Sequence, residues 1–283
     1  MTPTSVAGLQ DLLRTDGYLA DRGLATAAYV ALRLGRPLLL EGEVGVGKTE
    51  IAKALAQVLD RDLIRLQCYE GIDAHQALYE WDYARQLLSI RAADGADVRD
   101  LYGPDFLVER PLLAAVRAGE RAVLLIDEID RSDDEFEAFL LELLSDLQVT
   151  IPEIGTIAAE SPPLVVLTSN RTRELHDALK RRCLYHWVGY PEADRELEIV
   201  MTRAPEVAEA LARKIVDAVG RLRDLDLAKP PGVAESIDWV QTIAVVGGED
   251  LSREVAEDTL GAVVKDRDDL DLVEPSLDQV VGP

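Results

Sequence analysis

The sequence predicts an α/β fold in which a parallel β-sheet is covered by helices on both faces, followed by a smaller, all-helical part. Two observations predict it. Between residues 24 and 188, short continuously apolar runs alternate with segments of helical spacing, and such runs are typical of strands buried on both faces. After Pro191 the strand signal ends and only helical spacing remains. We therefore expect a domain boundary near residue 190.

The first elements lie between residues 24 and 127. Residues 24–35 predict a helix that ends at Gly35, because glycine suits the left-handed conformation of a helix end. A short strand within residues 36–42 and a helix over 48–59 follow. Next come strands at 63–67 and 122–127, with a helix at 111–119 before the second strand. Connections of this kind place a helix on one face of a parallel sheet.

The alternation continues to residue 188. We expect a helix over 135–147, a buried strand at 164–170, a helix over 173–182 and a last short strand at 184–188. Residues 148–160 predict two short strands around the turn Pro152–Gly155. Residues 191–225, 233–248 and 252–264 then have helical spacing, which predicts a helical domain over 191–264 behind an α/β domain over 1–190.

The C-terminal region is strongly acidic. Fifteen acidic and four basic residues lie between Asp224 and Pro283. A charge run of this kind is usually a solvated surface, and docking of a partner is the alternative. Residues 265–283 have weak periodicity, which predicts a loosely held acidic tail.

Composition and charge narrow the function. The chain has 283 residues, of which 48% are hydrophobic and 29% charged, as in ordinary globular proteins. Its 30 basic and 53 acidic residues leave a net charge of −23, which opposes binding to nucleic acid. We find no signal peptide and no apolar run near the ~20 residues of a membrane span. We therefore expect a cytoplasmic protein without a membrane span.

Cysteine and histidine residues do not point to a metal site. Cys68 and Cys183 are too few and too far apart in sequence for a disulfide framework, and each is most simply a small buried side chain. His75, His176 and His186 do not share metal-ligand spacing with one another or with the cysteines. Apart from Mg²⁺, we expect no bound metal.

A glycine-rich phosphate loop carries the strongest signal. Its spacing G-x-x-x-x-G-K-[ST] is flanked by a predicted strand and a predicted helix, and its members are Gly42, Glu43, Val44, Gly45, Val46, Gly47, Lys48 and Thr49. The glycines let backbone N–H groups converge on phosphate oxygens. Lys48 would reach the β- and γ-phosphates and Thr49 would bind Mg²⁺, so we expect ATP and Mg²⁺ as ligands. Glu43 occupies a variable position that can point outward.

Acidic and amide side chains follow two further strands. Asp127 and Glu128 end the 122–127 strand at the carboxyl edge of the sheet, where ligands of such sheets bind. Asp127 is placed to hold Mg²⁺, and Glu128 to polarise a water that attacks the γ-phosphate. Asn170 ends the 164–170 strand and could orient that water if this strand lies between the other two. The alternatives are a solvated strand end and a turn-forming asparagine.

Together these residues resemble the AAA+ ATPases, and within them the MoxR family. The resemblance spans residues 18–248. It rests on the phosphate loop, VLLIDEID at 123–130, LTSN at 167–170, and LKRRC at 179–183 followed by GYP. Residues 69–91 fall where MoxR proteins insert structure into the second helix, and residues 148–160 resemble their hairpin. The amino-acid sequences of these segments resemble those of the CoxD-type branch, which is associated with maturation of molybdenum–copper carbon monoxide dehydrogenase.

The resemblance implies roles for further residues. Arg182 would act as an arginine finger on the ATP of a neighbouring subunit, with Arg181 as its substitute, whereas the alternative is that both only stabilise a helix end. An active site completed in this way implies a ring, usually a hexamer. Asp238 stands where the family carries a sensor 2 arginine, so that sensor is either absent or replaced by another basic residue such as Lys229.

The family also suggests partners and an activity. Such proteins are chaperone-like remodellers that commonly work with a von Willebrand factor A domain partner. We expect an ATPase that remodels or activates a client metalloenzyme; a nucleic-acid-dependent motor and a non-hydrolysing, ATP-gated scaffold are the alternatives. Four aromatic residues in the insert would either grip a client or pack the insert down, namely Tyr69, Tyr79, Trp81 and Tyr83.

Overall fold

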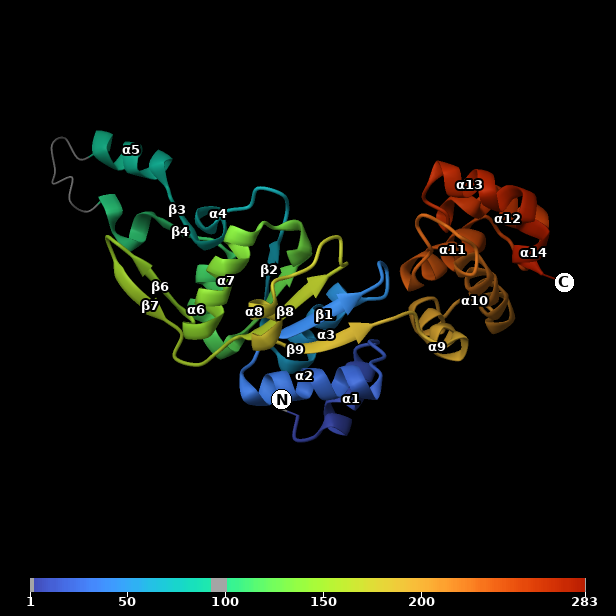
Figure 1. The fold of residues 1–283 in the computed structure, drawn as a ribbon, viewed down its shortest axis with the longest axis horizontal. Coiled ribbons are helices and arrows are strands. Elements are labelled where there is room, and N and C mark those ends of the chain that lie inside the picture. The colour runs from blue at the N-terminus through green and yellow to red at the C-terminus, as the bar shows by residue number, and fades with distance from the viewer. Residues whose placement is uncertain (1–2, 93–100, 283) are drawn as a thin grey trace. The chain divides into compact units, whose positions relative to one another are not determined.

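The computed structural model describes residues 3–92 and 101–282 and divides into two compact units (Figure 1). The first unit is formed mainly by Ala20–Glu41 and Thr49–Trp187, together with the N-terminal helix. The second contains Gly17–Leu19, Gly42–Lys48 and the chain from Val188 onward. Contacts thus group most of the glycine-rich loop with the second unit.

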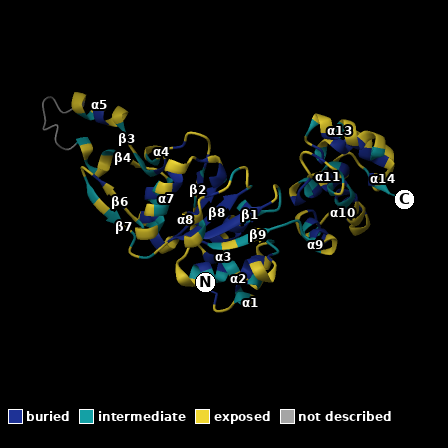
Figure 2. Cartoon of the chain, viewed as in Figure 1, coloured by how far each residue is buried: buried dark blue, intermediate teal, exposed yellow. Residues whose placement is uncertain are grey.

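A five-stranded sheet forms the centre of the first unit, in the order β2-β5-β8-β1-β9. The strands are β1 (Leu38–Gly42), β2 (Asp62–Gln67), β5 (Ala122–Asp127), β8 (Leu164–Ser169) and β9 (Leu184–Val188). The pairs β1·β8, β5·β8 and β2·β5 are parallel, which confirms the predicted parallel sheet. Every residue of β1, β5 and β8 is buried, as continuous apolar runs predict (Figure 2). The strand that ends before Asn170 lies between the other two site strands, as its predicted role requires.

Helices cover both faces of this sheet (Figure 1). They are α1 (Val6–Thr15), α2 (Arg22–Leu34), α3 (Lys48–Leu59), α6 (Pro111–Ala118), α7 (Asp134–Asp146) and α8 (Asp177–Arg182). Asp21 caps the start of α2 by accepting a hydrogen bond from the Leu24 N–H, and Gly35 ends that helix at φ 61°, as predicted. Alternate strand residues pack with α6 and α7 into one hydrophobic core, for example Leu39, Ile126 and Leu167.

The predicted helix over 173–182 is wrong in its first turn, since α8 begins only at Asp177. Side chains from the preceding elements hold the backbone of residues 171–176 in a loop. Asp130 Oδ2 accepts from the Thr172 N–H (2.8 Å), and Glu137 Oε2 accepts from the His176 N–H (2.9 Å). These tertiary hydrogen bonds outweigh the local helical propensity.

The segment after β2 is longer than the insert expected at 69–91. It contains α4 (Ala74–Leu78), β3 (Tyr79–Trp81) and α5 (Tyr83–Ala92), and it closes where β3 pairs with β4 (Leu107–Glu109). Trp81 is buried and packs edge-on against Tyr79 and Tyr102, with ring centroids 6.0 and 5.3 Å away. Tyr69 and Tyr83 are exposed. Packing thus accounts for Tyr79 and Trp81, whereas Tyr69 and Tyr83 lie at the surface.

The expected hairpin is confirmed. Strand β6 (Gln148–Ile151) pairs antiparallel with β7 (Gly155–Ala158) around the predicted turn.

Helices alone follow β9. They are α9 (Ala193–Arg203), α10 (Glu209–Arg223), α11 (Val233–Val245), α12 (Arg253–Thr259), α13 (Arg267–Val273) and α14 (Leu277–Val281). They enclose a core around the fully buried Trp239, whose indole N–H donates to Thr259 Oγ1 (2.8 Å). Among the described residues, no helix is both long enough and apolar enough to cross a bilayer.

The prediction of a loosely held tail over 265–283 is wrong for its described residues. Helices α13 and α14 bury Val273, Leu277 and Val280 in the core of the second unit. The Arg221 guanidinium also donates to the Val280 carbonyl (2.6 Å). Dense acidic residues on the exposed faces hid this weak apolar periodicity in the sequence.

Candidate functional site

The glycine-rich loop adopts a backbone that favours glycine at Gly42, Gly45 and Gly47, each of which has a positive φ. Gly45 has φ 73°, and a Cβ on Gly42 would lie 1.9 Å from the Val188 carbonyl oxygen. The Lys48 ammonium donates to the carbonyls of Gly42 (2.9 Å) and Glu43 (2.5 Å), while the Glu43 side chain is exposed. Val44 is exposed as well, and Val46 and Gly47 are partly buried. Lys48 then opens α3, so a helix N-terminus follows the loop.

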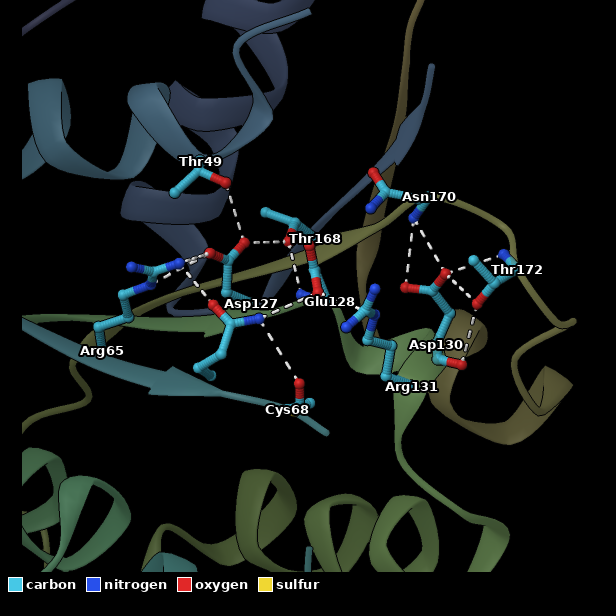
Figure 3. Close-up of polar contacts among 11 residues, drawn as sticks. Thr49, Arg65, Cys68, Asp127, Glu128, Asp130, Arg131, Thr168, Asn170 and Thr172 are labelled. Carbon is cyan, nitrogen blue, oxygen red and sulfur yellow. Dashed lines mark hydrogen bonds and ion pairs between the residues drawn. The ribbon is translucent and has the colours of Figure 1, made fainter. Parts of the chain in front are cut away.

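Asp127 is the centre of a polar cluster at the carboxyl end of β5 (Figure 3). Its side chain is buried, with 2% exposed. Its Oδ1 accepts hydrogen bonds from the hydroxyls of Thr49 (2.9 Å) and Thr168 (2.5 Å). Its Oδ2 accepts from Arg65 Nη2 (2.6 Å). A hydroxyl and a carboxylate in contact are the hard oxygen ligands that Mg²⁺ prefers, so Thr49 and Asp127 fit this ion.

Glu128 follows Asp127 in the left-handed conformation, at φ 54°. This backbone turns its side chain out of the strand, and its N–H donates to Thr168 Oγ1 (2.9 Å). Its Oε2 accepts from Gln67 Nε2 (3.1 Å) and pairs with Arg131 Nε (3.0 Å), with 31% of the side chain exposed. Glu128 is therefore held at the sheet edge and remains accessible to water.

Asn170 lies beyond the end of β8, where a buried carboxylate holds its backbone (Figure 3). Asp130 is 2% exposed and accepts from the Asn170 N–H (3.2 Å to both oxygens), the Thr172 N–H (2.8 Å) and the Thr172 hydroxyl (2.7 Å). Within residues 3–92 and 101–282, the Asn170 carboxamide itself makes no hydrogen bond. These hydrogen bonds to Asp130, which we call the clamp, fix the backbone of Asn170 and leave its carboxamide available.

Arg181 and Arg182 end α8, and both are exposed. Arg182 Nη1 donates to the Leu141 carbonyl of α7 (2.7 Å), whereas the Arg181 guanidinium has no partner in the described part of the chain. Arg36 organises this helix end. Its guanidinium donates to the carbonyls of Arg181 (3.1 Å), Arg182 (3.1 Å) and Cys183 (3.3 Å).

The helical unit supplies no basic residue from α11, the helix that carries Asp238. Asp238 is exposed. At the start of this helix, the Ala234 N–H donates to the Gly45 carbonyl (3.1 Å). Lys229 donates to Asp266 Oδ2 (2.8 Å), and this hydrogen bond raises the pKa of the Lys229 ammonium. Lys229 is thus engaged by a carboxylate of its own unit.

The two thiols are buried and unsuited to reaction. Burial raises the pKa of Cys68 to about 12, with Asp127 adding to the effect, and burial raises the pKa of Cys183 to about 12 as well. Their predicted burial is confirmed. In the described residues, no group of three or more His, Cys, Asp and Glu side chains is arranged to hold a metal ion.

Several polar residues around the site escaped sequence reasoning. Arg65 and Gln67 lie on β2, and they reach the acidic pair because Gln67 lies opposite Asp127 in the register of β2 and β5. Asp130 and Arg131 follow the acidic pair after Ile129, and Thr168 lies within the LTSN segment. Alternation along residues 63–67 could have drawn attention to Arg65 and Gln67, but their partners depend on strand order.

Comparisons with known proteins agree with this geometry. Residues 37–183 match the family described as "AAA domain (dynein-related subfamily)". The chain is 30% identical over 205 residues to the uncharacterized protein YehL of Escherichia coli, covering 67% of this chain and 52% of YehL. It therefore spans about half the length of that relative. It is 26% identical over 203 residues to the denitrification regulatory protein NirQ of Pseudomonas aeruginosa, covering 69% of this chain and 70% of NirQ.

Among solved structures, the chain is similar to a mutant of RuvB from Thermotoga maritima. The TM-score is 0.53 at 18% identity, and the match covers 92% of this chain and 72% of that one. At this identity the likeness shows the fold alone.

Proposed function

The chain belongs to the dynein-related AAA domain family, a family of AAA+ ATPases, and on that premise we propose that it binds Mg·ATP and hydrolyses it to drive the remodelling of another protein. The observation that carries the proposal is the cluster at Asp127. A threonine of the phosphate-loop motif contacts a buried strand-end aspartate at 2.9 Å, and a water-accessible glutamate follows directly. Nucleotide binding is typical of the family, and hydrolysis is the step that we add.

We assign each residue of the site a separate role in ATP hydrolysis. The glycine-rich loop would bind the phosphates through its N–H groups and Lys48. Thr49 and Asp127 would hold Mg²⁺, which when bound offsets the negative charge of the phosphate oxygens. Glu128 would accept a proton from the attacking water, and Asn170 would orient that water. Gln67 and Arg131 both contact the Glu128 carboxylate and would help to position it for this role.

We propose that the site is completed in a ring, as a hexamer, by an arginine of the adjacent subunit. Arg181 and Arg182 are exposed cations at one helix end, and Arg36 fixes the backbone of both. Arg182 donates to the Leu141 carbonyl of its own chain (2.7 Å), a hydrogen bond that it would exchange for the neighbour's phosphate. Such a finger stabilises charge on the transferred phosphoryl group.

For the client we propose a metalloenzyme, activated together with a partner that has a von Willebrand factor A domain. The support is the resemblance to MoxR proteins of the CoxD type and the relative named a denitrification regulatory protein. The net charge of −23 favours a protein client over a nucleic acid. A nucleic-acid-dependent motor and a non-hydrolysing scaffold remain the alternatives, the latter because α11 carries no sensor 2 arginine.

One assay tests the activity and separates these alternatives. Phosphate release is measured for the wild type and for Glu128→Gln, with and without single- and double-stranded DNA. We expect turnover by the wild type, a loss of at least about 100-fold in Glu128→Gln with ATP still bound, and no stimulation by DNA. Unchanged turnover in Glu128→Gln would refute the role of Glu128, and strong stimulation by DNA would favour the motor. Capture of partners by ATP-bound Glu128→Gln then identifies the client.

A further inference from the structure

Arg65 occupies the oxygen of Asp127 that faces away from the two threonines. Its Nε and Nη2 lie 3.1 and 2.6 Å from Oδ2, while Thr49 and Thr168 donate to Oδ1 (Figure 3). Both carboxylate oxygens therefore accept hydrogen bonds from side chains of the chain itself. A cation that draws Asp127 toward itself must compete with this guanidinium.

The charges explain why such a residue is useful. Asp127 is almost fully buried, and a buried carboxylate without a compensating charge is costly. Arg65 supplies that charge, and 49% of its side chain is exposed, so its guanidinium can move into water without disturbing the core. When a divalent cation binds beside Asp127, the guanidinium is no longer needed and is repelled by the new charge.

We propose that Arg65 is a stand-in cation, which compensates Asp127 in the metal-free protein and is displaced when Mg²⁺ binds with the nucleotide. Arg65 then lowers the affinity of the site for Mg²⁺ and sets how strongly nucleotide binding depends on the metal. Arg65 acts through Asp127 and is a positioning residue. The inference rests on the proposed binding of Mg·ATP.

The displacement would also reach the residue proposed to activate water. Arg65 Nη2 donates to Gln67 Oε1 (2.5 Å), and Gln67 Nε2 donates to Glu128 Oε2 (3.1 Å). A continuous hydrogen-bonded chain therefore runs from Asp127 through Arg65 and Gln67 to Glu128. When Arg65 leaves Asp127, Gln67 loses or changes its partner, and metal binding is coupled to the placement of Glu128.

The test measures binding and needs no turnover. Isothermal titration with a non-hydrolysable ATP analogue gives a dissociation constant in excess EDTA and another in excess Mg²⁺, and their ratio is the gain in affinity due to the metal. In Arg65→Gln we expect this gain to rise about tenfold over the wild type, a usual size for coupling between two ligands. The matched control is Arg117→Gln, which removes an arginine of similar exposure from an ion pair with Glu109 and should leave the gain unchanged.

A second variant and a second readout keep the test decisive. Arg65→Lys keeps a cation but loses the pair of N–H groups that both donate to Asp127 Oδ2. Its gain in nucleotide affinity due to Mg²⁺ should therefore lie between those of the wild type and Arg65→Gln. The rise in melting temperature caused by the Mg²⁺-bound analogue should follow the same order. An unchanged or smaller gain in Arg65→Gln, or a gain in Arg65→Lys as large as in Arg65→Gln, would overturn the inference. If the wild type binds no nucleotide, the proposed function itself fails, which is a distinct result.

Discussion

The clamp on Asn170 leads to a sharp prediction for Asp130→Asn. The buried Asp130 carboxylate accepts from two backbone N–H groups and one hydroxyl, and it is almost the same size as the amide that would replace it. An asparagine offers one acceptor oxygen and places an NH₂ group against donors. At least one hydrogen bond to a charged group is lost and one buried donor is left without a partner, for a total cost of about 3 kcal/mol. For a unit of this size the melting temperature should fall by roughly 6–12 °C.

The same change should act on turnover more than on binding. Asp130 contacts the segment 170–172 and no residue of the glycine-rich loop. We therefore expect kcat to fall at least about tenfold as the Asn170 carboxamide loses its position, with nucleotide affinity within about threefold. Steady-state ATPase kinetics and equilibrium titration measure the two effects.

Controls separate positioning from general destabilisation. Asp146→Asn makes the same chemical change at the exposed end of α7, where the carboxylate has no partner among the described residues, and it should leave both quantities unchanged. Asn170→Ala should lower kcat as well, and adding Asp130→Asn to it should cost little further. If Asp130→Asn melts earlier but keeps its kcat, or if affinity falls as much as kcat, the clamp does not position Asn170.

Three further predictions concern other parts of the molecule. Arg182→Ala should lower kcat by about 10³-fold or more and leave nucleotide affinity within about threefold, because the proposed finger would act on a neighbour's ATP; equal losses of binding and turnover would place it in its own site. Burial raises the pKa of Cys68 and Cys183 from 9.0 to about 12, so unfolded thiols ionise first. Their contribution to stability should be complete below pH 9 and decline as the pH rises toward 12, and native alkylation near pH 8 should be far slower than alkylation in denaturant. Val280→Asp should destabilise the second unit by about 3 kcal/mol or more, seen as an earlier melting transition, and an unchanged transition would contradict the packing of α14.

Local patterns sufficed for much of the fold. Continuous apolar runs predicted the strands around Leu39, Leu125 and Val166, because strands covered on both faces need no polar alternation. The phosphate-loop motif and the acidic pair could be recognised in the sequence because each consists of consecutive residues and needs no knowledge of the fold. The position of β8 between β1 and β5 was needed for the role of Asn170, and the structure places it there.

Features that depend on strand register or distant side chains could not be predicted in this way. Arg65 meets Asp127 only because β2 pairs with β5, at a separation of 62 residues. Residues 173–176 carry helical spacing, but Glu137 takes the backbone N–H of His176 and Asp130 takes that of Thr172. The apolar residues of α14 lie among acidic neighbours, and only the core that they enter shows their role.

The bonds made by Arg36 have a consequence for how subunits could communicate. Only Pro37 separates this residue from β1, the strand that leads into the glycine-rich loop, and its guanidinium donates to the carbonyls of three successive residues at the end of α8. The Leu184 N–H adds a bond to the Pro37 carbonyl (2.7 Å). These hydrogen bonds tie the start of β1 to the backbone of Arg181 and Arg182. In the proposed ring, a displacement of β1 on nucleotide binding would shift Arg181 and Arg182, so that successive sites would sense one another's occupancy through the backbone.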